Sequence, residues 1–217
     1  MLRRVQISLI LALCLFWTQA FASTCEQHFS HGVSPTLENR ALSTATTTLC
    51  YTGFATLHSG VSRTPLWSAE HLTIERLSRA RQMTRTDSFH ADPNLPNSHR
   101  SELGDYARTG YDRGHMAPSA DMPDERSQHE SFSLANIVPQ NPNNNRGLWE
   151  AIESTTRAIA QQSGEIYVVT GPLFEGQSVL ALRNRVMVPT GFFKAIYNPA
   201  TGTAGAYVVK NETGFDW

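Results

Sequence analysis

Histidine, arginine, carboxamide and carboxylate side chains gather in one stretch of the chain, from Tyr111 to Glu153. The stretch holds Asp-Arg-Gly-His at 112–115, Asn-Ile-Val-Pro-Gln at 136–140 and Asn-Arg-Gly-Leu-Trp-Glu-x-x-Glu at 145–153. Phosphodiester hydrolysis needs a base for the attacking water, a cation against the developing charge, and groups that hold the phosphate. Imidazole suits the first task and guanidinium forks suit the third. The stretch therefore predicts a phosphodiester-cleaving site.

Two residues of the stretch take roles from their chemistry. His115 is the candidate base, and Asn145 is the candidate Mg²⁺ ligand, because Mg²⁺ prefers oxygen ligands and keeps most of its water. Asn is also a favoured helix cap, so the asparagines at 143–145 could be a capping cluster instead. Arg157 follows Glu153 by one helical turn, and it could either contact a phosphate or pair with that carboxylate. Trp149 is expected in the core.

The three blocks, taken in order, resemble the DNA/RNA non-specific endonuclease family of the ββα-metal (His-Me finger) superfamily. The resemblance is clear from about Arg63 to Tyr197. It implies an α+β fold with a central, mostly antiparallel sheet and helices packed on both sides. It also implies Mg²⁺-dependent cleavage of DNA and RNA that leaves 5′-phosphates, with Mn²⁺ as a substitute metal.

The resemblance also assigns roles residue by residue. His115 would be the general base, and Asn145 would be the one direct protein ligand of the metal, with waters completing the shell. The other assignments surround these two: Arg113 and Asn136 support the site, Glu153 holds a water of the metal, Arg157 contacts the phosphate, and Arg85 corresponds to an upstream arginine of the family.

Hydrophobic patterning agrees with an α+β domain. Asn145–Gln162 is the clearest predicted helix, 123–130 predicts a shorter one, and 74–81 fits either a helix or a strand extension. Residues 86–101 predict a long polar loop. Strands are expected at 51–56, 66–73, 133–138, 166–170, 185–189, 192–197 and 206–210.

The first residues predict a secretory signal peptide at 1–22, with Arg3 and Arg4, an apolar run to Trp17 and a cleavage site at Ala20–Ala22. A membrane anchor or a lipoprotein signal fits less well, because the run is short and no lipobox precedes Cys25. We therefore expect a secreted or periplasmic protein without a membrane anchor after cleavage.

The remaining chain divides into an N-terminal arm at 23–62 and a nuclease domain at 63–217. Cys25 and Cys50 could form a disulfide in the arm or stay as free thiols. The sequence stops soon after a predicted strand, so it leaves open a truncation at the C-terminus. The oligomeric state is also open, with a homodimer as one option.

Charge alone does not indicate a nucleic-acid binder. Without residues 1–22 the chain has 16 basic and 19 acidic residues, although only Lys194 and Lys210 among the basic ones are not arginine. Two other functions remain open. One is a non-catalytic nucleic-acid-binding protein of the same fold, for example in DNA uptake. The other is a carbohydrate hydrolase, for which Glu150 and Glu153 are the nearest carboxylate pair.

Overall fold

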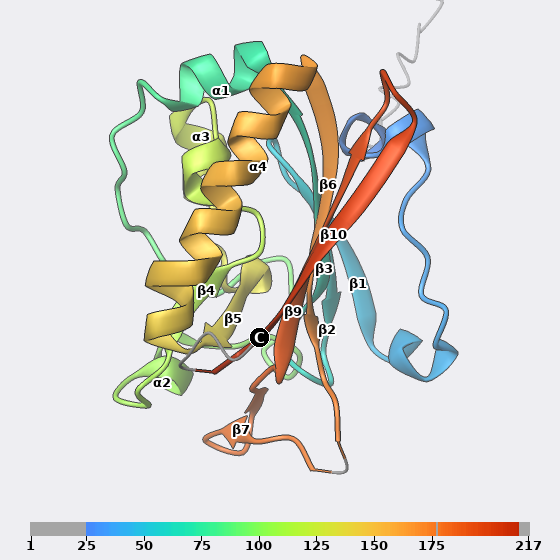
Figure 1. Cartoon of the computed structure of the whole chain (residues 1–217). Helices are drawn as coiled ribbons and strands as arrows, with labels where there is room; N and C mark the ends of the chain where they lie inside the picture. The colour runs from blue at the N-terminus through green and yellow to red at the C-terminus, as the bar shows by residue number, and fades with distance from the viewer. Residues whose placement is uncertain (1–24, 177, 213–217) are drawn as a thin grey trace, which may run out of the picture.

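A six-stranded antiparallel sheet forms the centre of the protein (Figure 1). The computed structural model describes residues 25–176 and 178–212. The strands lie in the order β1-β2-β3-β6-β9-β10, so consecutive hairpins build both ends of the sheet and a long connection joins β3 to β6. The strands are β1 (Thr46–Cys50), β2 (Ala55–Ser59), β3 (Thr64–Thr73), β6 (Glu165–Leu173), β9 (Gly191–Asn198) and β10 (Thr203–Lys210).

The connection between β3 and β6 folds into a second layer on one face of the sheet (Figure 1). A two-stranded ribbon of β4 and β5 lies within this layer, and a small hairpin of β7 and β8 lies beyond one end of the sheet. The elements are α1 (Ile74–Ala80), α2 (Leu103–Tyr106), β4 (Asp112–His115), α3 (Glu125–Ser131), β5 (Ile137–Gln140), α4 (Glu150–Ser163), β7 (Ala181–Leu182) and β8 (Val186–Met187).

The α+β prediction with a central antiparallel sheet is confirmed, with one difference in the helical cover. The four α-helices lie on one face of the sheet (Figure 1). The other face is covered by short 3₁₀ turns at Glu26–His28 and Ser30–Gly32. Phe29, between these turns, packs edge-on against Trp67 of β3, with 5.9 Å between ring centroids. Among the described residues, one face of the sheet therefore carries the helical layer in which a site can be built.

Apolar side chains fix the helical layer to the sheet. Trp149 is buried at the start of the long helix and packs with Met116, Val138, Ile152 and Phe192. This cluster joins the β4–β5 ribbon, α4 and β9 into one core. The prediction that Trp149 belongs to the core is confirmed.

Local capping explains where the helices begin and end. The Thr73 hydroxyl accepts a hydrogen bond from the Arg76 amide at 3.2 Å, so 74–81 becomes helix α1 and not an extension of β3. Asp124 caps α3 in the same way through the Ser127 amide at 2.8 Å. The long helix ends at Gly164, whose φ of 91° favours glycine.

Two predicted strands are only partly right, because each begins too early. At 51–54 the chain turns between β1 and β2, closed by a hydrogen bond from the Tyr51 amide to the Phe54 carbonyl at 2.9 Å, and β2 begins at Ala55. Gly53 lets Met122 pack closely there, because a Cβ would lie 2.5 Å from Met122 Sδ. At 133–138 a 3₁₀ turn (Leu134–Asn136) precedes β5, which continues through Pro139. A proline is tolerated because β5 pairs only with β4 and keeps an open edge.

The predicted N-terminal arm at 23–62 includes Thr46–Cys50, which is strand β1 of the main sheet. Residues 23–62 therefore contribute β1 and β2 to the same sheet as the rest of the chain. The predicted signal peptide at 1–22 lies outside the described residues. No helix in the described part of the chain combines the length and apolar character needed to cross a membrane.

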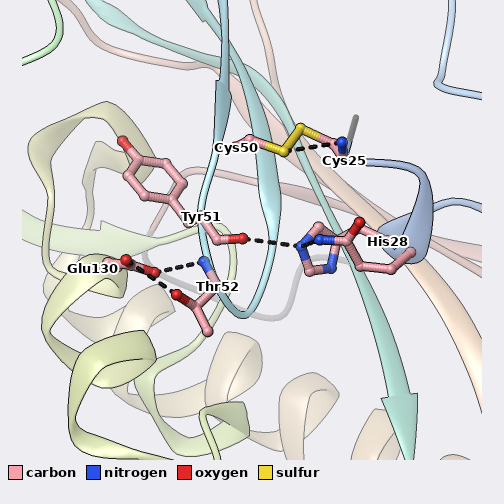
Figure 2. The surroundings of a disulfide bond; sticks show 7 residues. Cys25, His28, Cys50, Tyr51, Thr52 and Glu130 are labelled. Atoms are coloured by element: carbon pink, nitrogen blue, oxygen red, sulfur yellow. Dashed lines mark hydrogen bonds between the residues drawn. A yellow bond between two sulfur atoms is a disulfide. The ribbon is translucent and has the colours of Figure 1, made fainter. Parts of the chain in front are cut away.

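A disulfide joins Cys25 to Cys50, at the end of β1 (Figure 2). Polar contacts surround it on the β1–β2 turn. His28 Nε2 donates to the Tyr51 carbonyl at 3.0 Å, and Glu130 of α3 accepts from the Thr52 amide at 2.6 Å (Figure 2). The disulfide therefore ties the N-terminal turns to a hairpin that is itself held by the helical layer.

We expect the Cys25→Ser/Cys50→Ser double variant to lose about 3 kcal/mol of unfolding free energy, because the bond closes a loop with a sequence separation of 25 residues. Urea denaturation under oxidising conditions measures this as a lower midpoint, with a slope that is equal or steeper because the unfolded chain is more expanded without the bond. An unchanged midpoint would show that the bond does not restrain the unfolded chain.

Candidate active site

A cavity of about 820 Å³ lies in the helical layer, between β4, the segment at 85–89, the loop after α2 and the start of the long helix. Five residues predicted for the site line it: Arg85, Arg113, His115, Asn145 and Glu153. The structure therefore brings the candidate base and the candidate metal ligand to one cavity. Asn136 and Arg157 do not line it.

His115, at the end of β4, is held by rings and not by hydrogen bonds. Its imidazole lies 4.9 Å from the Phe132 ring and 5.4 Å from the Phe89 ring, centroid to centroid. Nε2 is buried without a hydrogen-bond partner among the described residues. Burial first, and then the charges of Arg85 and Arg113, lower the pKa of His115 to about 3. The ring is therefore neutral near pH 7 and can accept a proton.

Gly114, next to His115, allows Gln140 to cross the β4–β5 ribbon. A Cβ at position 114 would lie 2.0 Å from Gln140 Oε1. The buried Gln140 side chain then donates from Nε2 to Asn144 Oδ1 at 2.8 Å. A glycine at position 114 thus leaves room for the Gln140 side chain. Through its bond to Asn144, Gln140 links β5 to the turn that carries Asn145.

Asn145 lies in a π-helical turn, Asn144–Trp149, that precedes α4. Its Nδ2 donates to Asp112 Oδ2 at 2.9 Å, which fixes the orientation of the carboxamide. Arg146 binds the same carboxylate through Nε at 2.8 Å and Nη2 at 2.6 Å. Partial burial raises the pKa of Asp112, but the bonds from Arg146 and Asn145 outweigh this effect and lower the pKa below its usual value. Asn145 Oδ1 has no donor among the described residues.

The last described strand also fixes this turn. Asn144 Nδ2 donates to the Lys210 carbonyl at 2.9 Å. Asn211 accepts from the Asn141 amide at 2.7 Å and donates to the Pro139 carbonyl at 3.1 Å. The turn with Asn145 is therefore held from β4, β5 and the end of β10.

Asn136 supports the histidine strand from inside the protein. Its Oδ1 accepts from the Ser68 hydroxyl at 2.8 Å and from the Ala117 amide at 2.9 Å. Its Nδ2 donates to the Ala117 carbonyl at 2.8 Å and to the Ser131 carbonyl at 2.9 Å. With these bonds and full burial, Asn136 positions the backbone after His115 and does not face the cavity.

The two arginines that line the cavity near His115 lie on its aromatic neighbours. Arg113 is 4.0 Å from the Phe89 ring centroid, and Arg85 is 5.1 Å from the Phe132 ring centroid. Arg85 also donates to Ser119 Oγ at 2.9 Å and pairs with the exposed Asp87 at 2.7 Å. Both guanidinium groups are thus placed near the imidazole by cation–π contacts.

Arg157 lines an adjacent pocket of about 470 Å³, which shares Arg85, Ser119 and Ala120 with the main cavity. Its Nη1 lies 3.2 Å from Asp121 Oδ1. The alternative ion pair with Glu153 is not formed. Arg157 therefore lies beside the cavity, where it is paired with the buried carboxylate of Asp121.

Glu153 is the cavity-lining member of a buried cluster of charges. The other members are Glu70, Asp121, Arg76, Arg157 and Lys194. Lys194 of β9 is only 1% exposed and donates to Thr170 Oγ1 at 2.7 Å. Burial raises the pKa of Glu153 to about 7, and Lys194 and Arg157 act in the opposite direction. Burial also raises the pKa of Glu70, which Arg76 contacts at 3.2 Å.

Several positioning residues were missed in the sequence. Asp112 stands directly before Arg-Gly-His, and Phe89 stands four residues after Arg85. Both lie near predicted site residues, but the sequence did not predict their contacts with Asn145 and Arg113. Lys194 could have been found from the sequence. It lies two residues from both Phe192 and Ile196, so the three side chains share the inward face of the apolar strand β9. Phe132 and Asn211 carried no sequence signal.

Comparison with known proteins identifies the class of this fold and site. Residues 33–216 match the family model described as DNA/RNA non-specific endonuclease, which extends the resemblance beyond 63–197 on both sides. The chain belongs to the DNA/RNA non-specific endonuclease family.

Named relatives agree with this assignment. The chain is 34% identical over 177 residues to the mitochondrial nuclease EXOG of Danio rerio, covering 74% of this chain and 51% of the relative. It is 34% identical over 165 residues to nuclease C1 of Cunninghamella echinulata, covering 69% of this chain and 66% of the relative. It is 34% identical over 152 residues to human endonuclease G, covering 65% and 51%. The chain thus spans about half to two thirds of the length of these relatives.

A solved structure supports the same fold. A chain in the crystal structure of the EndoG/EndoGI complex superposes with a TM-score of 0.72 at 27% identity, covering 89% of this chain and 82% of that one.

The raised pKa of Glu153 predicts a pH-dependent gain in stability for Glu153→Gln. Unfolded glutamate releases its proton near 4.5, whereas the folded group holds it to about 7, so this group costs stability as pH rises between these values. Without metal, the variant should melt above the wild type at pH 8, and the difference should close near pH 4.5.

Glu150→Gln is the matched control, because Glu150 also lines the cavity but is exposed. Thermal unfolding of the three proteins in EDTA at both pH values measures the effect. A Glu153→Gln difference that is the same at both pH values would contradict a burial-raised pKa.

Proposed function

We propose that this protein is an exported, Mg²⁺-dependent endonuclease that hydrolyses phosphodiester bonds of DNA and RNA with little sequence preference, leaving 5′-phosphates. The observation that carries the proposal is that His115 and the fixed carboxamide of Asn145 line one cavity. Family membership agrees with it.

His115 is proposed to take the proton from the attacking water. Its buried Nε2 makes no hydrogen bond with the described residues, and its lowered pKa keeps the ring neutral. The two nearby guanidinium groups contribute to the lowered pKa. A bound phosphate would offset their charge, so we expect the imidazole to become a stronger base when substrate is present.

The donor set around Asn145 fits a hydrated magnesium ion. Within 25–176 and 178–212, no group of three or more His, Cys, Asp or Glu side chains is arranged to hold a metal. Mg²⁺ does not need such a group, because it can be held by one or two protein oxygens and its own waters. Asn145 Oδ1 provides a neutral oxygen, and Glu153 offers a carboxylate to a water of the shell. The ion would supply positive charge against the phosphate, and Mn²⁺ could replace it.

The remaining residues bind and hold the substrate. Arg113 and Arg85 present guanidinium groups beside His115, where they match phosphate oxygens. Arg157 is proposed to contact the phosphate from the adjacent pocket. Asn136 holds the backbone after His115 and makes no substrate contact.

Plasmid digestion tests the proposal. We expect cleavage with Mg²⁺ and none with EDTA, and a fall of about 10²- to 10⁴-fold in kcat for His115→Ala, because a general base is lost. Asn145→Ala should lose activity at ordinary Mg²⁺ concentrations. Asn143→Ala, two residues earlier and exposed, is the matched control that should retain it.

Activity that survives chelation, or Asn145→Ala behaving like Asn143→Ala, would refute the mechanism. A gel shift of intact DNA in Mg²⁺ without cleavage would instead support the non-catalytic binding protein.

Export is proposed from Arg3, Arg4, the apolar run to Trp17 and Ala20–Ala22. The disulfide between Cys25 and Cys50 agrees with an oxidising compartment. We expect the protein recovered from a periplasmic or culture fraction to begin at Ser23 by intact mass. Protein in that fraction that still carries residues 1–22 would contradict cleavage of a signal peptide.

A further inference from the structure

The loop after α2 forms a rim of the cavity, and Arg108 of this loop lines the cavity without an assigned role. The residue is exposed and makes no hydrogen bond or ion pair with the described part of the chain. The other cavity-lining arginines are occupied by Asp87, Asp112 or an aromatic ring. Arg108 is therefore a free cation at the cavity edge.

The backbone of Arg108 is unusual for an arginine. Its φ of 59° lies in the left-handed region, which disfavours any residue with a Cβ and favours glycine. Such conformations persist where the surrounding structure imposes them, and they occur preferentially at functional sites. Arg63 and Arg183 also have a positive φ, so the conformation fixes the direction of the loop, and the place of Arg108 at the cavity edge is what suggests a role for its side chain.

The surroundings of this loop impose its conformation. Arg183, in the β7–β8 turn, donates through Nη2 to the Ala107 carbonyl at 2.8 Å and through Nε to the Gly104 carbonyl at 2.9 Å. Thr109 Oγ1 donates to the Tyr106 carbonyl at 2.8 Å. Arg185 pairs with Asp105 of α2 at 2.9 Å. Arg108 therefore extends from a fixed base, which limits the ordering cost of binding through it.

Positive charge also lies beyond the other end of the site. The adjacent pocket is lined by Arg81, Arg85 and Arg157 and shares residues with the cavity. In the helical layer, α1 and α2 lie at opposite ends with β4 between them (Figure 1). Arginines that follow α1 (Arg81) and α2 (Arg108) thus lie in the two connected pockets, an arrangement that suits successive phosphates of one polynucleotide strand.

We propose that Arg108 binds a backbone phosphate of the nucleotide next to the scissile bond, on the side of the site away from Arg157. The inference rests on the proposed function and extends it, because it makes the substrate a strand of several nucleotides. A substrate with only one phosphodiester cannot use this contact.

The test compares two substrates in Arg108→Gly: a single-stranded oligonucleotide and bis(p-nitrophenyl) phosphate. For the oligonucleotide we expect KM to rise roughly five- to tenfold, and the slope of log KM against log salt to fall by about one. The effect should be absent with the small diester. Glycine suits the φ of 59°, so the melting temperature should be unchanged or higher.

Arg126→Ala is the matched control, since Arg126 is an exposed arginine that lines neither the cavity nor the adjacent pocket. A KM and salt slope in Arg108→Gly equal to those of Arg126→Ala would overturn the inference. An equal loss with both substrates would also overturn it, because Arg108 would then act on the chemistry.

The outcome can be separated from failure of the proposed function. If the wild type cleaves neither substrate, nuclease activity is refuted. Fluorescence anisotropy of the labelled oligonucleotide in EDTA then decides the inference: weaker binding by Arg108→Gly than by Arg126→Ala supports it, and equal binding overturns it.

Discussion

The hydrogen bonds of the Asp112 carboxylate join the two halves of the candidate active site. One oxygen accepts from Asn145 Nδ2, and both oxygens accept from Arg146. Asp112 lies on the strand that ends in His115, so the base and the candidate metal ligand share one short, rigid connection. Without this carboxylate the Asn145 amide could rotate, and its free oxygen would have no defined direction. Preorganisation of this kind is what a hydrated ion with a single protein ligand requires.

Buried charge beneath the cavity accompanies this arrangement. Glu70, Asp121 and Lys194 are nearly inaccessible to solvent, and Glu153 reaches from this cluster to the cavity. Placing charges in a protein interior costs free energy even when they are paired. Carboxylates and cations balance in number here, so the cluster holds a carboxylate at the cavity without leaving a large net charge inside. The pKa of Glu153 is raised because the neighbouring cations offset only part of the free-energy cost of burying its charge.

The local parts of the site could be predicted from sequence, and the long-range parts could not. Asn145, Glu153 and Trp149 lie on one helical segment, as their spacing predicted. His115 lies at the end of a strand far from them in sequence, and its place in the same site was expected from the family resemblance. The antiparallel sheet was expected from short predicted strands mixed with one long helix. The Tyr51 turn was missed because its closure depends on Met122 and Glu130, far along the chain. Asn136 was predicted at the site, but only its contacts with the backbone of Ala117 and Ser131 show that it positions main chain.

The dependence of the Asn145 turn on Lys210 and Asn211 has a consequence for biosynthesis. A polypeptide emerges from its amino end, so these two residues appear after His115 and Asn145. A partly made chain can contain His115 and Asn145 but lack the contacts that hold the turn before the long helix in place. The cleft is then completed only after Asn211 has emerged from the ribosome.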